Sequence, residues 1–317
     1  MQIKFPILLV VTLIFLGCQH QPKQTDTITI ATLKGPSAMG MIKFIDSVNT
    51  VNGSHIKVEI LNEPIQVRKM VIDGSADFAI LPTTMAAILY NKGIDYRLLA
   101  IPVWGTLYLF GNDTTITEWE HLRGKRIHAM AKGMTPDVLF RYLLMQHGLD
   151  PDKDVTLDYS FPTHIDLANA VAAGQANLGV ISEPMVSLVM QRNTNVKSIF
   201  DLNAEWEKVL DVPIAQTAFI VKGKFAESNM EDVERIIQSY QYSTQWVNQY
   251  PDSAANLIVK YNILPNAQVA ANAITRSNLK FVKANTISTQ ISSYLNIFYQ
   301  MSPDIIGGKL PNENFYQ

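Results

Sequence analysis

A glycine turn between two patterned stretches constrains this chain more than any other feature. Residues 27–33 alternate in polarity, which predicts a β-strand. Gly35 then permits a tight turn, Pro36 and Ser37 are residue types that begin helices, and apolar residues recur at helical spacing over 38–48. Such a turn presents free backbone N–H groups and the positive end of a helix dipole. Gly35, Pro36 and Ser37 are therefore candidate ligand contacts, although an ordinary strand-to-helix connection looks the same.

The same pattern recurs in the second half of the chain. Residues 126–131 resemble a strand, Gly133, Met134 and Thr135 form the turn, and an amphipathic stretch follows. This copy begins roughly 100 residues after the first, as expected for an internal repeat. Gly133, Met134 and Thr135 thus become candidate contacts of a second, similar lobe.

Another pair of segments repeats in the same order. Residues 74–85 align with residues 174–185, and in each copy a glycine, an apolar strand and a new helix follow one another. Thr83, Thr84 and Glu183 occupy the turns of these segments. The threonine hydroxyls could serve only as helix caps, and common strand–helix units could match by chance.

Alternation of strands and helices predicts an α/β fold of two lobes, each a mainly parallel sheet flanked by helices. Two extended stretches, 101–110 and 216–223, are the expected crossovers, with the hinge near 103–106 and 216–219. We expect lobe I to comprise 27–104 plus 219–317 and lobe II to comprise 105–218. The tail after Val221 is expected to be helical, without a further strand, and to pack on lobe I.

The first residues have the pattern of an export signal. One lysine, an apolar run and Gly17-Cys18 predict a lipoprotein signal peptide over 1–17 and a polar tether over 18–26. Phe15-Leu16-Gly17-Cys18 resembles a bacterial lipobox, which implies lipidation of Cys18. An uncleaved anchor or a free thiol is the alternative. Because Cys18 is the only cysteine, the chain cannot form an internal disulfide.

Composition excludes several function classes. The formal net charge is −2 over 317 residues, which argues against nucleic acid as a partner. The sequence has no Walker loop, G-x-S-x-G or H-E-x-x-H motif, and its six histidines do not pair at metal-ligand spacing. We expect no enzyme activity, cofactor or metal, and a monomer. Trp104, near the first crossover, is either an aromatic wall of a pocket or a core tryptophan.

These motifs together resemble those of periplasmic substrate-binding proteins of ABC importers, in the branch similar to nitrate, taurine, alkanesulfonate and pyrimidine-precursor binders. The resemblance covers nearly all of the chain after the tether and implies a type 2 periplasmic-binding fold. It is carried by residues 33–36, 39–40, 74–80, 122–125, 133–136, 148–151 and 183–184. Family members often have Gly-Ser-Thr where this chain has Gly133-Met134-Thr135.

The resemblance implies an exported, lipid-anchored protein that faces the periplasm or cell exterior. It would capture a small solute by lobe closure and deliver it to a membrane permease. A sensor, or an enzyme on the same fold, is the alternative. The charge of the solute stays open at this point, because helix N-termini favour anions whereas Glu183 would repel one and no arginine lies in the turns.

Overall fold

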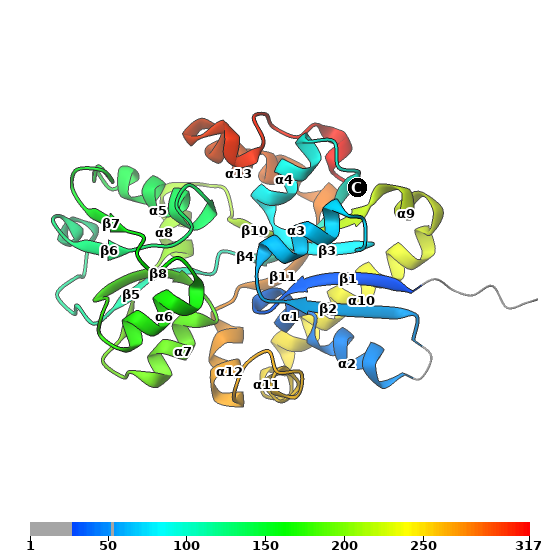
Figure 1. Cartoon of the computed structure of the whole chain (residues 1–317), viewed down its shortest axis with the longest axis horizontal. Coiled ribbons are helices and arrows are strands. Elements are labelled where there is room, and N and C mark those ends of the chain that lie inside the picture. Colours follow the sequence, from blue (N-terminus) through cyan, green and yellow to red (C-terminus); the bar gives the residue numbers. More distant parts are fainter. Residues whose placement is uncertain (1–26, 52–53) are drawn as a thin grey trace, which may run out of the picture.

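The computed structural model describes residues 27–51 and 54–317, which form two α/β lobes side by side (Figure 1). The predicted signal peptide and tether, including Cys18, lie outside the described residues. Among those described, no helix combines the length and the hydrophobicity needed to cross a bilayer. The two-lobe α/β prediction is confirmed.

Lobe I is built on a six-stranded sheet in the order β11-β4-β10-β3-β1-β2. Its strands are β1 (Ile28–Leu33), β2 (Ile56–Leu61), β3 (Phe78–Pro82), β4 (Tyr96–Trp104), β10 (Ala215–Lys222) and β11 (Leu279–Lys283). The helices that pack around it are α1 (Pro36–Gly40), α2 (Ile42–Thr50), α3 (Pro64–Ile72), α4 (Thr83–Asn91), α9 (Gly223–Ser228), α10 (Met230–Gln249), α11 (Pro251–Lys260), α12 (Ala267–Thr275) and α13 (Ser288–Met301). Short 3-10 turns lie at Ala284–Thr286, Pro303–Ile306 and Glu313–Phe315.

Lobe II is built on a five-stranded sheet in the order β7-β6-β8-β5-β9. Its strands are β5 (Leu107–Gly111), β6 (Arg126–His128), β7 (Thr156–Asp158), β8 (Leu178–Ser182) and β9 (Lys197–Asp201). Its helices are α5 (Thr135–Gln146), α6 (His164–Ala172), α7 (Met185–Arg192) and α8 (Leu202–Val209), with a 3-10 turn at Trp119–Leu122. In both sheets the first strand–turn–helix unit pairs in parallel with the strand that follows it, so the repeat in the sequence corresponds to a repeat in structure.

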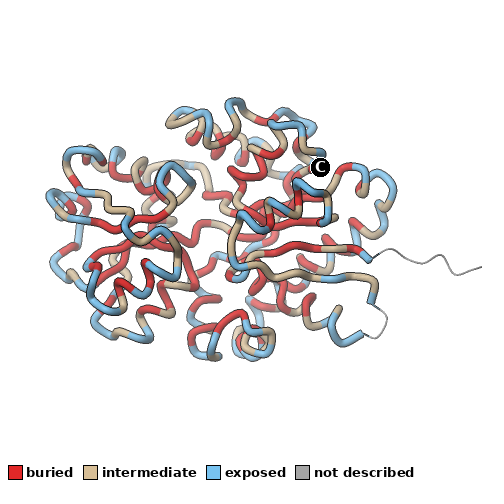
Figure 2. The backbone as a smooth tube through the Cα atoms, in the orientation of Figure 1, coloured by how far each residue is buried: buried red, intermediate tan, exposed pale blue. Residues whose placement is uncertain are grey.

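The lobes share part of their apolar interior. Buried residues continue through the region where the lobes meet (Figure 2), and one cluster joins side chains of both sheets. On one side of this junction the ring of Trp206 in α8 lies 6.3 Å from that of Tyr294 in α13. Helix α13 of lobe I therefore contacts α8 of lobe II through this aromatic pair.

The crossover is a small hydrogen-bonded unit. The chain passes from one sheet to the other through Gly105 and Thr106. The Thr106 amide donates to Gln216 Oε1 at 2.7 Å, and Gln216 Nε2 donates to Thr106 Oγ1 at 2.7 Å. Asn278 Nδ2 donates to the Gly105 carbonyl at 2.6 Å. A Cβ on Gly105 would lie 2.2 Å from Asn203 Oδ1, so this close approach requires glycine.

Two expectations about the tail differ from the structure. β10 pairs with β3 and β4 from Ala215 onward, so the return crossing occupies 210–214 and not 216–219, and the boundary at 218/219 falls inside a strand. The tail also contains β11, which pairs with β4. The prediction of a helical tail without a strand was wrong, because five residues of alternating polarity between helices are too few to stand out.

Candidate functional site

Helices of both lobes begin where the parallel strands end, and these helix starts meet between the lobes. α4 follows β3 in lobe I, while α5 follows β6 in lobe II. Thr84 Oγ1 and Thr135 Oγ1, from these two helices, are 2.7 Å apart and share a hydrogen bond. The turn before α4 in lobe I and the turn before α5 in lobe II therefore meet across the junction.

A second approach between the lobes involves the first glycine turn. Gly35 precedes α1 with φ +146° and ψ −146°, a conformation that favours glycine. A Cβ at this position would lie 3.5 Å from Pro184 Cδ, which belongs to the turn after β8 in lobe II. Gly35 and the Glu183–Pro184 turn are thus neighbours, as two faces of one site require.

Glu183 does not present a free carboxylate. It is 3% exposed and accepts hydrogen bonds from Arg276 Nε at 2.6 Å, Ser187 Oγ at 3.0 Å and the Ser187 amide at 3.1 Å. Burial raises the pKa of Glu183, while Arg276 and Ser187 act in the opposite direction. Its charge is compensated by Arg276, so the repulsion of an anion that the sequence suggested is largely removed.

Arg276 reaches the site from the tail. It follows α12, and its guanidinium carbon lies 4.4 Å from the centre of the Tyr108 ring. Its Nε pairs with Glu183, whereas its Nη2 is buried without a hydrogen-bond partner among the described residues. Arg276 adds a hydrogen-bond donor whose charge is balanced by Glu183, and no feature of the sequence indicated it.

Three buried threonine hydroxyls lie at the same edge of the lobe I sheet. Thr32 is the penultimate residue of β1, Thr83 begins α4, and Thr217 lies on β10 opposite Pro82. They are 0%, 1% and 7% exposed, and none of the three hydroxyls has a hydrogen-bond partner within the described part of the chain. Because an unpaired buried hydroxyl costs free energy, this group is suited to a ligand that supplies the missing partners.

Most of the other residues predicted as ligand contacts make their hydrogen bonds within their own lobe or are exposed. The Gly133 amide donates to Asp137 Oδ2 at 2.7 Å, so it is occupied within its own turn, and Met134 is 49% exposed. The Trp104 indole N–H donates to the Lys280 carbonyl at 2.7 Å, which fixes the ring against β11. Pro36 is half-buried and Ser37 buried at the start of α1. The structure does not test any of these residues as ligand contacts.

His164 is a further candidate that the sequence did not single out. It is the first residue of α6, at the carboxyl end of β7, and is half-buried. Burial lowers the pKa of His164 to about 4, so the imidazole is neutral near pH 7. A neutral ring both donates and accepts hydrogen bonds. The sequence could have indicated His164 only as a histidine directly after the helix cap Thr163, and that pattern is too common to indicate a ligand site.

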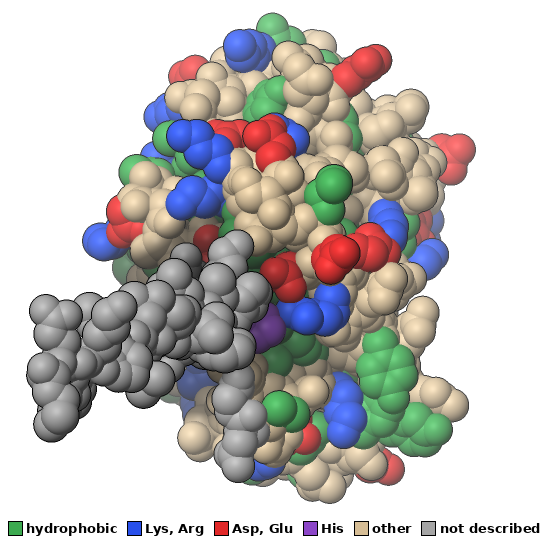
Figure 3. All heavy atoms as spheres, turned by 90° about the vertical axis from the view of Figure 1, so that its right-hand side faces the viewer, with side chains coloured by type: hydrophobic (Ala, Val, Ile, Leu, Met, Phe, Trp, Pro, Cys, Tyr) green, Lys and Arg blue, Asp and Glu red, His purple; other side chains and the backbone are tan. Residues whose placement is uncertain are grey.

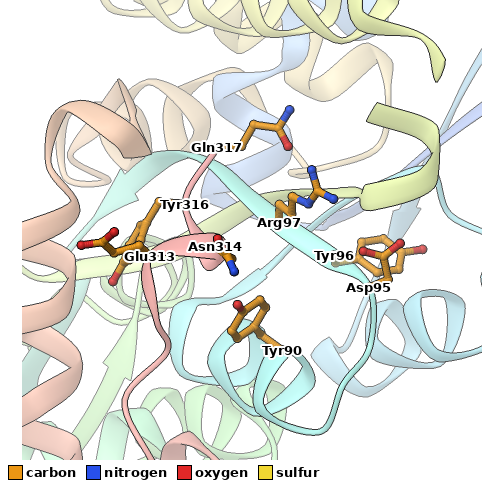
Figure 4. Close-up of a pocket in the computed structure, with 8 residues that line it drawn as sticks. All are labelled: Tyr90, Asp95, Tyr96, Arg97, Glu313, Asn314, Tyr316 and Gln317. Carbon is orange, nitrogen blue, oxygen red and sulfur yellow. The ribbon is translucent and has the colours of Figure 1, made fainter. Parts of the chain in front are cut away.

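One hollow in the surface lies elsewhere. It has a volume of about 510 Å³ and is lined by residues at the end of α4, the start of β4 and the C-terminus, among them Tyr90, Arg97 and Tyr316 (Figure 4). Nine extended residues of β4 separate it from Trp104 at the other end, about 27 Å away. The outer end of lobe I, seen in Figure 3, intersperses acidic and basic side chains. The residues that line the hollow of Figure 4 are not those of the strand-end turns before α1, α4 and α5.

Comparison with known proteins identifies the family. Residues 37–245 match the model of the family described as "ABC transporter, phosphonate, periplasmic substrate-binding protein". The chain belongs to this family. The family and the solved structures that the chain resembles are substrate-binding proteins of transport, not enzymes.

Individual relatives agree with this assignment. The chain is 27% identical over 147 residues to the putative binding protein YtlA of Bacillus subtilis, which covers 46% of this chain and 42% of the relative. The chain thus spans less than half the length of that curated relative. An ABC transporter structure from Parabacteroides distasonis is 26% identical and has a TM-score of 0.78, over 92% of this chain and 99% of the other.

Two more distant structures show the same fold. The aliphatic sulphonate binding protein SsuA of Escherichia coli is 18% identical with a TM-score of 0.71, over 90% of this chain and 92% of that one. The nitrate-binding protein NrtA of Synechocystis is 14% identical with a TM-score of 0.62, over 89% and 84% of the two chains. The type 2 periplasmic-binding fold expected from the sequence is confirmed.

Proposed function

We propose that this chain is the lipid-anchored substrate-binding component of an ABC importer, which holds a small oxyanion between its lobes and delivers it to a membrane permease. The observation that carries the proposal is the meeting of one strand-end turn from each lobe, where Thr84 and Thr135 are 2.7 Å apart. A solute that contacts both sets of turns would stabilise the closed arrangement by its differential contacts.

The polar groups of the site favour an anion over a neutral solute. Helix starts contribute backbone N–H groups and the positive ends of dipoles. Arg276 has an unpartnered Nη2, and the hydroxyls of Thr32, Thr83 and Thr217 are unpartnered in the described residues. The carboxylate of Glu183 is already paired. A sulfonate, phosphonate or nitrate group has several acceptor oxygens for such donors, and the names of the relatives mention these groups.

The test is a thermal-shift and calorimetric screen with defined probes. Taurine, ethanesulfonate, methylphosphonate and nitrate are compared with uracil and glucose as uncharged controls. A probe at a hundred times its Kd should stabilise the protein by about 2.7 kcal/mol. Stabilisation by uncharged probes only, or by none of the anions, would contradict the proposed solute class.

Matched variants locate the binding. Thr217→Val removes a hydroxyl that has no hydrogen-bond partner within the described residues, so folding should be little affected while affinity for the active anion falls about tenfold. Thr156→Val, at an exposed position of β7, is the control and should bind normally. Equal affinity of the Thr217 variant would place the solute elsewhere.

The lipid anchor and the permease are tested separately. Mass spectrometry of the membrane fraction should find diacylglycerol on Cys18, and Cys18→Ser should release the protein from membranes. Uptake of the active anion should require both this protein and a permease with its ATPase. Binding without uptake would favour a sensor instead.

A further inference from the structure

The hydroxyl contact between the lobes is made by two rigid helix starts. Thr84 stands on α4, whose Met85, Ala86 and Leu89 are buried in the shared core. Thr135 begins α5, and the turn before it is held by the bond from the Gly133 amide to Asp137. The distance between the two hydroxyls is therefore set by the angle between the lobes and little else.

The described residues make other polar contacts between the lobes. At the surface, the side-chain amides of Gln191 in α7 and Asn266, just before α12, exchange hydrogen bonds of 3.3 and 3.0 Å. The ion pair of Arg276 with Glu183 lies two residues from Asn278, whose side chain is bonded to Gly105 at the crossover. A contact so near the pivot changes little when the lobes rotate. The pair of Thr84 and Thr135 joins strand-end turns of both sheets, and rotation would separate these turns.

We infer that Thr84 and Thr135 form a closing latch, a mutual hydrogen bond that favours the closed arrangement of the lobes and that acts as one unit. This inference rests on the proposed function, because closure is the step that it controls. It changes the role expected for these two residues from independent ligand contacts to positioning residues for each other.

A count of the available donors supports the inference that Thr84 and Thr135 act as one unit. Each hydroxyl has one hydrogen to donate, and the mutual bond consumes one of the two. Neither hydroxyl has another hydrogen-bond partner in the described chain. At most one hydrogen of the pair is left for a solute, so the two threonines cannot both donate to it while they bond each other.

The experiment measures lobe closure directly, without any solute. Spin labels are placed at Lys69→Cys on α3 and Lys153→Cys in lobe II, whose side chains are each 80% exposed, in a full-length chain carrying Cys18→Ser. Pulsed electron spin resonance then gives the distribution of distances between the labels. Thermal melting of each variant verifies that it is folded.

The variants form a double-mutant cycle. Thr84→Val and Thr135→Val should each reduce the ratio of closed to open molecules about fivefold, which corresponds to one net hydrogen bond. The double variant should show no further loss, because both changes delete the same bond. Thr84→Ser retains the hydroxyl and should retain the wild-type ratio, and Thr156→Val is the surface control.

Several results would overturn the latch. Additive losses in the double variant would mean that the two hydroxyls act on different partners. Unchanged ratios in both valine variants, or a wild-type protein without a closed population, would mean that the bond does not hold the lobes. Failure of the anion screen leaves this test intact because no solute is used, and failure of the latch leaves the proposed binding function standing.

Discussion

Replacement of Arg276 by methionine tests the electrostatic interpretation of the site most severely. The change retains much of the side-chain volume but leaves Glu183, whose side chain is 0% exposed, without its positive partner. Removal of one member of a buried ion pair costs about 3–5 kcal/mol. The Arg276 side chain is itself 27% exposed, so solvent screening places the expected cost near the lower end of that range, about 3 kcal/mol.

The pH dependence of this loss has a definite sign. Burial raises the pKa of Glu183 and Arg276 opposes that rise, so the variant should raise the pKa further. A carboxyl whose folded pKa lies above its unfolded value destabilises the protein at high pH, and this effect is relieved as pH falls and the folded carboxyl takes up a proton. The deficit against wild type should therefore be larger at pH 8 than at pH 5.

Urea unfolding at the two pH values is the assay, with thermal melting as a second probe. A loss of about 3 kcal/mol lowers Tm by about 5 °C in a chain of this size. Arg192→Met, at an exposed arginine of α7, is the matched control, and Glu183→Gln combined with Arg276→Met should recover most of the loss. A deficit under about 1 kcal/mol, or one equal at both pH values, would refute the reasoning.

Four other substitutions have expected outcomes. Tyr294→Phe removes a buried hydroxyl without a hydrogen-bond partner among the described residues and should leave Tm equal or higher, whereas Tyr240→Phe loses a 3.0 Å bond to a backbone carbonyl and should cost about 1 kcal/mol. Gly111→Ala places a Cβ 2.0 Å from the Asn177 carbonyl oxygen and should cost about 3 kcal/mol by urea midpoint; an unchanged midpoint contradicts this. Because the folded pKa of His164 is about 4, below the unfolded value of about 6.5, stability should fall as pH drops between those values, and His164→Gln should abolish that part of the decline.

The predictable part of the fold is the part encoded by local patterns. The strand, glycine and helix-start sequence at Gly35 recurs at Gly133, and both copies fold as strand–turn–helix units. Since carboxyl ends of parallel strands share one edge of a sheet, the placement of Thr84 and Thr135 in strand-end turns followed from position alone, whereas their direct hydrogen bond is a finding of the structure. Local spacing was sufficient to place these two residues, because each lies in a strand–turn–helix unit that the sequence pattern indicates.

The rest of the site depends on contacts that no local pattern contains. Arg276 reaches Glu183 only because α12 packs against α7, a tertiary contact between segments far apart in sequence. Thr217 faces the sheet edge because β10 inserts between β3 and β4, and β11 is too short for its alternation to be distinctive. The roles of Glu183 and Arg276 therefore follow from long-range packing, which a single sequence leaves undetermined.

The position of β10 has a consequence for biosynthesis. β10 lies between β3 and β4, so the central ladder of lobe I remains incomplete until the ribosome has made the chain beyond Lys222. Lobe II, in contrast, is one uninterrupted segment and has all five of its strands once Asp201 has emerged. Although lobe I is begun first, lobe II is the lobe whose strands are complete first, and pairing across β3, β10 and β4 awaits the returning strand.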